Sequence, residues 1–152
     1  MSIKKIMLIF SILLLLSFVL VLAHTDEVIE EAGVDATRFF FLMRTMDSHL
    51  DFNLDLAKSQ SQENPVYYIQ YAHARICSVL RQADERALSW DPNAGTSALD
   101  QLNDENETAL LGKLASYPDI LRRAAAEHAP HQIAQYLREL AAALHAWYNS
   151  SQ

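Results

Sequence analysis

The chain has 152 residues, a single cysteine and a formal net charge of -7. This length leaves room for one ordinary domain, and one cysteine provides neither a disulfide framework nor a cysteine-based metal site. The acidic balance argues against broad nonspecific attraction to nucleic acid, because that attraction depends on lysine and arginine neutralising phosphates. We therefore expect no DNA partner.

The composition favours helices. Only three glycines and four prolines interrupt a chain that is rich in alanine, leucine, glutamate and glutamine, which are strong helix formers. The sequence has no alternating valine, isoleucine and threonine runs bounded by turn residues, as strands would show. The predicted fold class is all-α, an antiparallel helical bundle preceded by a hydrophobic N-terminal helix.

Residues 1–23 form the hydrophobic segment. Lys4 and Lys5 precede an apolar run at 6–23 that only Ser11 and Ser17 interrupt. This pattern is typical of a signal peptide or of a membrane anchor, and its length is near the lower limit for spanning a bilayer. An anchor would keep the N-terminus in the cytoplasm and place the rest of the chain outside. Both interpretations stay open.

Two helices are predicted between residues 24 and 44. The first begins with acidic residues from Asp26 onward, which suit the positive end of a helix, and it ends at Gly33. The second covers residues 34–44, and the adjacent Phe39 and Phe40 on its apolar face predict core packing.

Residues 47–58 alternate between apolar and polar side chains. That period predicts a short strand or extended segment leading into a helix. Asp51 and Asp55 invite a catalytic or metal-binding interpretation, but their place on the polar side favours solvated charge or helix capping. The polar residues 59–63 then form a joint between two parts of the chain.

Residues 64–82 predict a long helix, because Asn64 and Pro65 are typical of a helix start. One row at three- and four-residue steps is predicted to face the core. Cys77 is predicted to be a buried structural thiol on the same side. The row consists of Val66, Ile69, His73, Ile76 and Leu80.

A second row on the same helix contains Tyr68, Tyr71 and Arg75. Two aromatic planes and a guanidinium within two turns suit stacking on unpaired bases and contact with phosphate. Tyrosines at this spacing also occur as ordinary packing residues with hydroxyls in solvent. The residue types alone leave both interpretations open.

The C-terminal half predicts a loop at 91–97 followed by three helices. The first of these covers residues 105–116 and is expected to end at Tyr117, because a residue before proline avoids helical geometry. The second covers residues 119–127. The last, at 133–148, is amphipathic and includes Tyr136.

No catalytic or metal-binding set is evident. The six histidines show no metal-ligand spacing, and a His73–Cys77 nucleophilic pair lacks an orienting third group. No glycine-rich phosphate loop, serine elbow or P-loop occurs. We therefore predict no catalytic residues and no metal ligands in this chain.

Bacterial arginyl-tRNA synthetases, the arginine-tRNA ligases, contain consecutive segments that closely resemble three stretches of this chain. These are GVDATRFFFLMR from Gly33, DSHLDFNLDLAKSQSQENPVYYIQYAHARICSVLR from Asp47, and YPDILRRAAAEHAPHQIAQYLRELAAALHAWYN from Tyr117. The resemblance covers residues 25–149. It implies that residues 24–62 are similar to the end of the catalytic domain. Residues 63–152 are then similar to the DALR-type anticodon-binding helical domain and are expected to be C-terminally incomplete.

The resemblance also implies a partner, tRNA(Arg), with Tyr68, Tyr71, Arg75 and Tyr136 as tRNA-binding residues. The family uses ATP with magnesium, but its HIGH-type and KMSKS-type signatures are absent from this sequence. We therefore expect no cofactor in this chain and no ligation of arginine by the chain alone.

Competing predictions come from residues 1–23. A membrane-tethered or exported helical interaction protein would account for the hydrophobic segment, and a non-functional remnant of a gene fusion would account for both features. The resemblance predicts a cytoplasmic location, whereas the segment predicts membrane association or export.

Overall fold

The structure is a computed structural model that describes residues 26–45, 48–49, 51–89 and 91–150. The elements are α2 (Val34–Leu42), α3 (Leu54–Lys58), α4 (Pro65–Glu85), α5 (Pro92–Ser97), the 3-10 helix η1 (Leu99–Gln101), α6 (Glu105–Ala126) and α7 (His131–Ser150). Every regular element in the described ranges is helical, which confirms the predicted all-α class. The predicted hydrophobic segment, residues 1–23, lies outside these ranges.

Within the described ranges, no helix is both long enough and apolar enough to cross a membrane.

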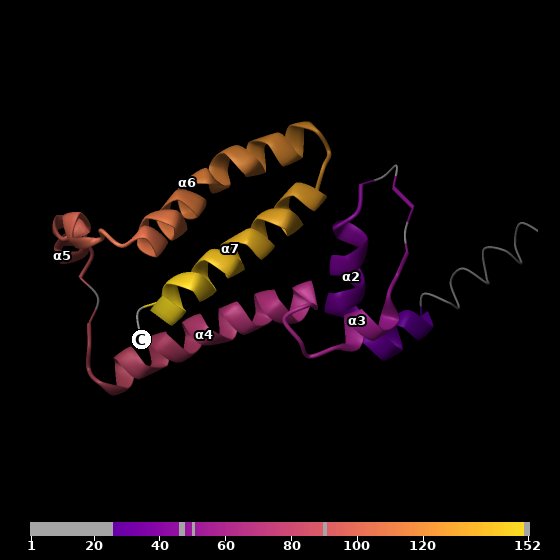
Figure 1. The fold of residues 1–152 in the computed structure, drawn as a ribbon, viewed down its shortest axis with the longest axis horizontal. Helices are drawn as coiled ribbons and strands as arrows, with labels where there is room; N and C mark the ends of the chain where they lie inside the picture. The colour runs from indigo at the N-terminus through magenta and orange to yellow at the C-terminus, as the bar shows by residue number, and fades with distance from the viewer. Residues whose placement is uncertain (1–25, 46–47, 50, 90, 151–152) are drawn as a thin grey trace, which may run out of the picture.

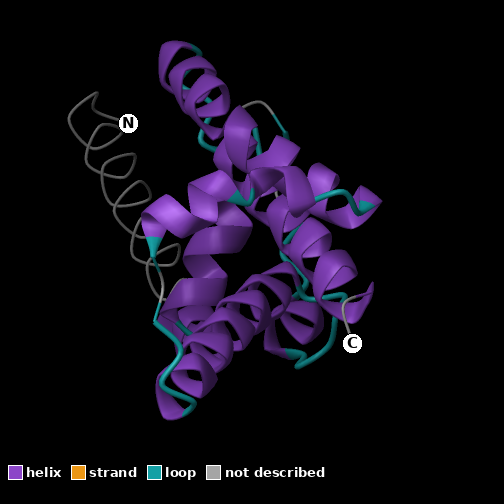
Figure 2. Cartoon of the chain, turned by 90° about the vertical axis from the view of Figure 1, so that its left-hand side faces the viewer, coloured by secondary structure: helices purple, strands orange, loops and turns teal. Residues whose placement is uncertain are grey.

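Helix α7 is the central element. Figure 1 shows α6 and α4 on opposite sides of it, and α7 contacts both. Residues 127–130 join α6 to α7, and such short connections produce antiparallel neighbours. The rotated view in Figure 2 shows the described chain as helices and loops. The predicted aromatic row of α4 lies on the face of this helix that meets α7.

A small core lies where α2, α3 and the start of α4 meet. Phe40 is 7% exposed and packs with Ala36, Ala57 and Val66. Its ring centroid is 5.5 Å from that of Phe52. The prediction that the phenylalanine cluster packs in the core is confirmed for Phe40.

Gly33 separates α2 from the helical residues 26–32. Its φ of 83° is in the region that glycine adopts without the steric penalty of a side chain. The chain can therefore end one helix and begin the next at a single residue, as the sequence predicted.

Residues 51–53 form no strand, so of the two predicted alternatives the extended segment leading into a helix holds. Helix α3 begins at Leu54 because Asn53, in extended geometry, accepts a 2.9 Å hydrogen bond at Oδ1 from the Leu56 amide. The predicted loop at 91–97 is wrong, because these residues contain the short helix α5, whose start is capped by Asp91. In both places a side-chain oxygen satisfies a helix amide.

The predicted break at Tyr117 is also wrong, because α6 is one helix of 22 residues that continues through Pro118. Proline removes one backbone hydrogen bond from a helix interior, and its ring crowds the carbonyl of the preceding turn, at a cost of about 3 kcal/mol. A capping box between Asp104 and Glu107 stabilises the start of α6, and packing against α7 runs along it. These interactions outweigh the local cost of the proline.

Candidate nucleic-acid interface

Tyr68, Tyr71 and Arg75 lie together on α4, as the sequence predicted, and they face α7. The ring centroid of His145 on α7 is 4.7 Å from that of Tyr68 and 5.5 Å from that of Tyr71. Tyr68 and Arg75 are partly buried, whereas Tyr71 remains 41% exposed. The row is thus both part of the packing between two helices and part of the surface.

Arg75 holds this cluster together. Its Nη1 lies 3.2 Å from His145 Nδ1 and donates to Asn149 Oδ1 at 3.2 Å, while Nη2 donates to the Tyr71 hydroxyl at 3.2 Å. The guanidinium carbon is 4.7 Å from the ring centroids of both Tyr71 and Tyr148. Cation–π contacts of this kind favour a fixed guanidinium. We call these five residues, together with Tyr68, the Arg75 cluster.

Helical spacing explains this arrangement. Residues 68, 72 and 75 are four and three positions apart, so they share one face of α4. Ala72 between them is 5% exposed, and its small side chain lets the two helices approach. The larger flanking side chains then meet α7.

The predicted core row is buried at Val66, partly buried at Ile69 and exposed from His73 onward. Ile76 is 43% exposed, Leu80 is 61% exposed, and Cys77 is exposed rather than buried. The predicted buried thiol is therefore wrong. Tyrosine and arginine present large apolar bodies beneath their polar ends, and on α4 Tyr68, Tyr71 and Arg75 contact His145 of α7.

Ile76 and Leu80 line a shallow apolar groove of about 200 Å³ beside Arg75. Residues of α7, including Leu144, form its other side. The aliphatic row therefore flanks the contact with α7 instead of forming its centre.

His145 is a site residue that sequence reasoning missed. It is 7% exposed, and its Nε2 makes no hydrogen bond of ordinary geometry among the described residues. Burial lowers the pKa of His145, the Tyr68 backbone partly offsets this, and the charge of Arg75 lowers the pKa further. Ala141 and His145 are four residues apart, so they lie on one stripe of the last helix, and both are buried. This helical spacing was the sequence feature from which the burial of His145 could have been predicted.

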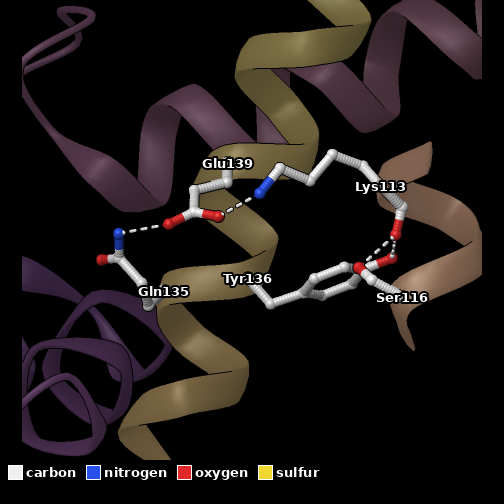
Figure 3. Close-up of polar contacts among 5 residues, drawn as sticks. All are labelled: Lys113, Ser116, Gln135, Tyr136 and Glu139. Atoms are coloured by element: carbon white, nitrogen blue, oxygen red, sulfur yellow. Dashed lines mark hydrogen bonds and ion pairs between the residues drawn. The ribbon is translucent and has the colours of Figure 1, made fainter. Parts of the chain in front are cut away.

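Tyr136 lies apart from the Arg75 cluster, between α7 and α6. It is 4% exposed, and its ring centroid is 5.3 Å from that of Tyr117. Its hydroxyl donates to the Lys113 carbonyl oxygen at 3.3 Å (Figure 3). Burial raises the pKa of Tyr136. In this structure its ring is covered and cannot stack on a base.

The same two helices are joined by an ion pair beside Tyr136. Figure 3 shows the Lys113 ammonium meeting a Glu139 oxygen, with Gln135 donating to the other oxygen at 2.8 Å. These bonds lower the pKa of Glu139, that from Lys113 most strongly. Tyr136 and Glu139 together fix how α6 and α7 pair.

The chemistry of the Arg75 cluster is that of binding. Arginine has five N–H donors, and three of those on Arg75 are used within the cluster. The guanidinium carbon lies 4.7 Å from the ring centroid of Tyr71, whose side chain is 41% exposed. A planar ring beside such donors suits an unpaired base and its phosphate. No group of three or more histidine, cysteine or acidic side chains in the described chain is placed to hold a metal ion.

Residues 69–152 match the family described as the DALR anticodon binding domain. The chain belongs to this family. The match includes Tyr71, Arg75 and Tyr136, and Tyr68 lies one residue before it.

Several arginine-tRNA ligases are similar to this chain over most of its length. An arginine-tRNA ligase of Legionella pneumophila (strain Corby) is 56% identical over 126 residues, which are 83% of this chain and 22% of that protein. One from Thioalkalivibrio sulfidiphilus (strain HL-EbGR7) is 55% identical over the same share of this chain and 22% of its own length. The DALR chain thus spans about a fifth of the length of these relatives.

A solved structure shows the same fold. The crystal structure of a putative arginyl-tRNA synthetase from Campylobacter jejuni matches 83% of the DALR chain and 27% of its own, with a TM-score of 0.69 and 32% identity. The resemblance drawn from the sequence is confirmed by these three comparisons.

Proposed function

We propose that this DALR chain binds the anticodon loop of a tRNA that accepts arginine. The observation that carries the proposal is the exposed ring of Tyr71 beside the guanidinium of Arg75, within the residues that match the anticodon binding family. The names of the relatives supply the amino acid that the tRNA would accept.

Each residue has a distinct part in this proposal. Tyr71 stacks on an unpaired base through the part of its ring that Tyr67 and Arg75 leave exposed. Arg75 donates to a phosphate or a base edge. Tyr68 is partly buried against His145. Its part is therefore to hold α4 against α7 and to offer the RNA only the exposed portion of its ring. Tyr136 acts indirectly by holding α6 against α7, because its side chain is covered.

Stacking must supply much of the affinity. The chain carries a net charge of -7, so a broad electrostatic contribution of the kind that dominates nonspecific binding is unfavourable. Stacking on an aromatic side chain contributes about 1–3 kcal/mol per base. Recognition of an unpaired loop therefore fits this chain better than recognition of a duplex.

A second part of the proposal concerns the ligase reaction for which the relatives are named. We propose that this chain alone does not ligate arginine, because positioned ATP phosphates and an arginine pocket are needed and the sequence shows no motif for them. Arginine-dependent pyrophosphate exchange by the purified chain would contradict this statement.

Binding of arginine tRNA to the purified chain tests the main proposal. We expect binding to exceed that of a tRNA for another amino acid, and Tyr71→Ala to weaken it about tenfold or more, from the loss of one stacked base. Tyr117→Ala is the matched control, because Tyr117 is 42% exposed on α6, close to the 41% of Tyr71. Equal losses in both variants, or no binding by the unchanged chain, would contradict the proposal.

The alternative of a membrane-tethered or exported interaction protein is not favoured. The relatives described above are named as arginine-tRNA ligases, and no observation in the described ranges points to a membrane partner. The hydrophobic residues 1–23 lie outside those ranges.

A further inference from the structure

We infer that His145 is a positioning residue that, in its neutral form, holds the Arg75 guanidinium in the orientation needed for RNA contact. The inference rests on the proposed function of the Arg75 cluster and adds a residue on the opposite helix. It follows from the contact between Arg75 Nη1 and His145 Nδ1 at 3.2 Å.

The chemistry of this contact fixes the state of the histidine. Arginine can only donate, so Nδ1 must accept, and an accepting Nδ1 requires a neutral ring with its proton on Nε2. Asn149 and the Tyr71 hydroxyl accept the other bonds of the guanidinium. Three acceptors from two helices thus determine the plane in which Arg75 lies.

The surroundings oppose protonation of His145. From α4 it faces the cation of Arg75 and the rings of Tyr68 and Tyr71, and α7 adds Tyr148 and Asn149 around the same guanidinium. No carboxylate among the described residues bonds to either ring nitrogen. A proton on Nδ1 would remove the acceptor and place two cations 3.2 Å apart.

The lowered pKa of His145, caused first by burial, agrees with this geometry. The ring therefore stays neutral near pH 7. On acidification it gains a proton at a pH below its ordinary value of 6.5, and Arg75 then loses one of its three fixed acceptors.

Three variants separate positioning from general packing. His145→Asn places an amide oxygen near the position of Nδ1 and cannot titrate, whereas His145→Leu keeps the bulk and removes the acceptor. His73→Leu is the control for the loss of a histidine, because His73 is exposed elsewhere on α4. Circular dichroism at each pH establishes that every variant is folded.

We expect arginine tRNA to bind His145→Leu about tenfold more weakly than the unchanged chain at about pH 7.5, from the loss of one charge-assisted bond. His145→Asn should rescue most of that loss. Between about pH 7.5 and pH 5 the unchanged chain should lose about tenfold in affinity relative to His145→Asn, and His73→Leu should behave like the unchanged chain. Equal affinities for the Leu and Asn variants, or a ratio of unchanged to Asn affinity that is independent of pH, would overturn the inference.

A measurement without RNA distinguishes this inference from the proposed function. The 15N spectrum of the His145 ring should show a proton on Nε2 and an unprotonated Nδ1 near neutral pH. A proton on Nδ1 would overturn the positioning role whatever the RNA result. The expected tautomer together with no RNA binding would overturn the proposed function, and with it the role of Arg75 orientation in RNA contact.

Discussion

The side-chain amide of Asn64 donates to the carbonyl oxygen of Ala57 at 3.0 Å, across the turn that joins α3 to α4. The same amide donates to the Ser59 carbonyl at 2.8 Å, and its oxygen accepts from the Val66 amide at 3.0 Å. Asn64 is 4% exposed. One buried side chain therefore both caps α4 and fixes its approach to the N-terminal core.

Replacing Asn64 should lower the unfolding free energy, and its donor and acceptor roles can be tested separately. Asn64→Asp keeps the capping oxygen but turns the donor into an oxygen that faces two carbonyls, so we expect a loss of about 2–4 kcal/mol in unfolding free energy. Chemical denaturation measures it. Asn53→Ala, which removes an exposed cap at α3, is the control and should cost about 1 kcal/mol. A smaller loss for Asn64→Asp than for the control would contradict the double role.

Replacing Pro118 should stabilise the chain. Pro118 has no N–H to donate within the 22-residue helix α6, so Pro118→Ala should restore a backbone bond and raise the unfolding free energy by about 1–3 kcal/mol. Thermal melting followed by circular dichroism measures the change. If α6 instead ended at Tyr117, the substitution would leave stability unchanged or lower it.

Tyr136→Phe tests the bond between α7 and α6. The substitution removes the hydroxyl that meets the Lys113 carbonyl and should cost about 0.5–1.5 kcal/mol in unfolding free energy. Ser116 also donates to that carbonyl, at 2.7 Å, so the carbonyl keeps one partner and the loss stays moderate. Tyr117→Phe is the control, and an equal or larger effect there would argue against the assigned bond.

The unfolding free energy of the chain should depend on pH through the protonation of His145. Because burial lowers its pKa in the folded state below the ordinary 6.5, the unfolded chain binds more protons between these two values. The stabilising contribution is complete above about pH 6.5 and is lost as the pH falls through the folded-state pKa. The unfolding free energy of the unchanged chain should therefore fall relative to that of His145→Asn in this window. A constant difference across the window would contradict a lowered pKa.

The spacing in the sequence grouped Tyr68, Tyr71 and Arg75 on one face of α4, as the structure shows, but it predicted that the opposite, aliphatic row would be the buried one. Tyr68, Tyr71 and Arg75 were placed correctly on one face, since helical period depends only on spacing. Which face is buried depends on the partner helix, and α7 brings His145 to the aromatic row. Spacing within α4 contains no information about α7.

The fold was predictable in class and in most helices, but less so at their ends. Gly33 and Asn64 acted as the sequence predicted, because glycine conformation and asparagine capping are local properties. Pro118 did not, because contacts with a helix later in the chain decide whether α6 continues. His145 escaped notice for the same reason, since its role arises only when Arg75 lies opposite.

The most direct test of the anticodon-binding account is a double-mutant cycle between Tyr71→Ala and an abasic nucleotide at each unpaired position of the arginine tRNA anticodon loop. Stacking of Tyr71 on a base predicts a coupling energy of about 1–2 kcal/mol at one or two positions. The same cycle with Tyr117→Ala should give none. Coupling energies near zero for Tyr71 at every loop position would contradict the account.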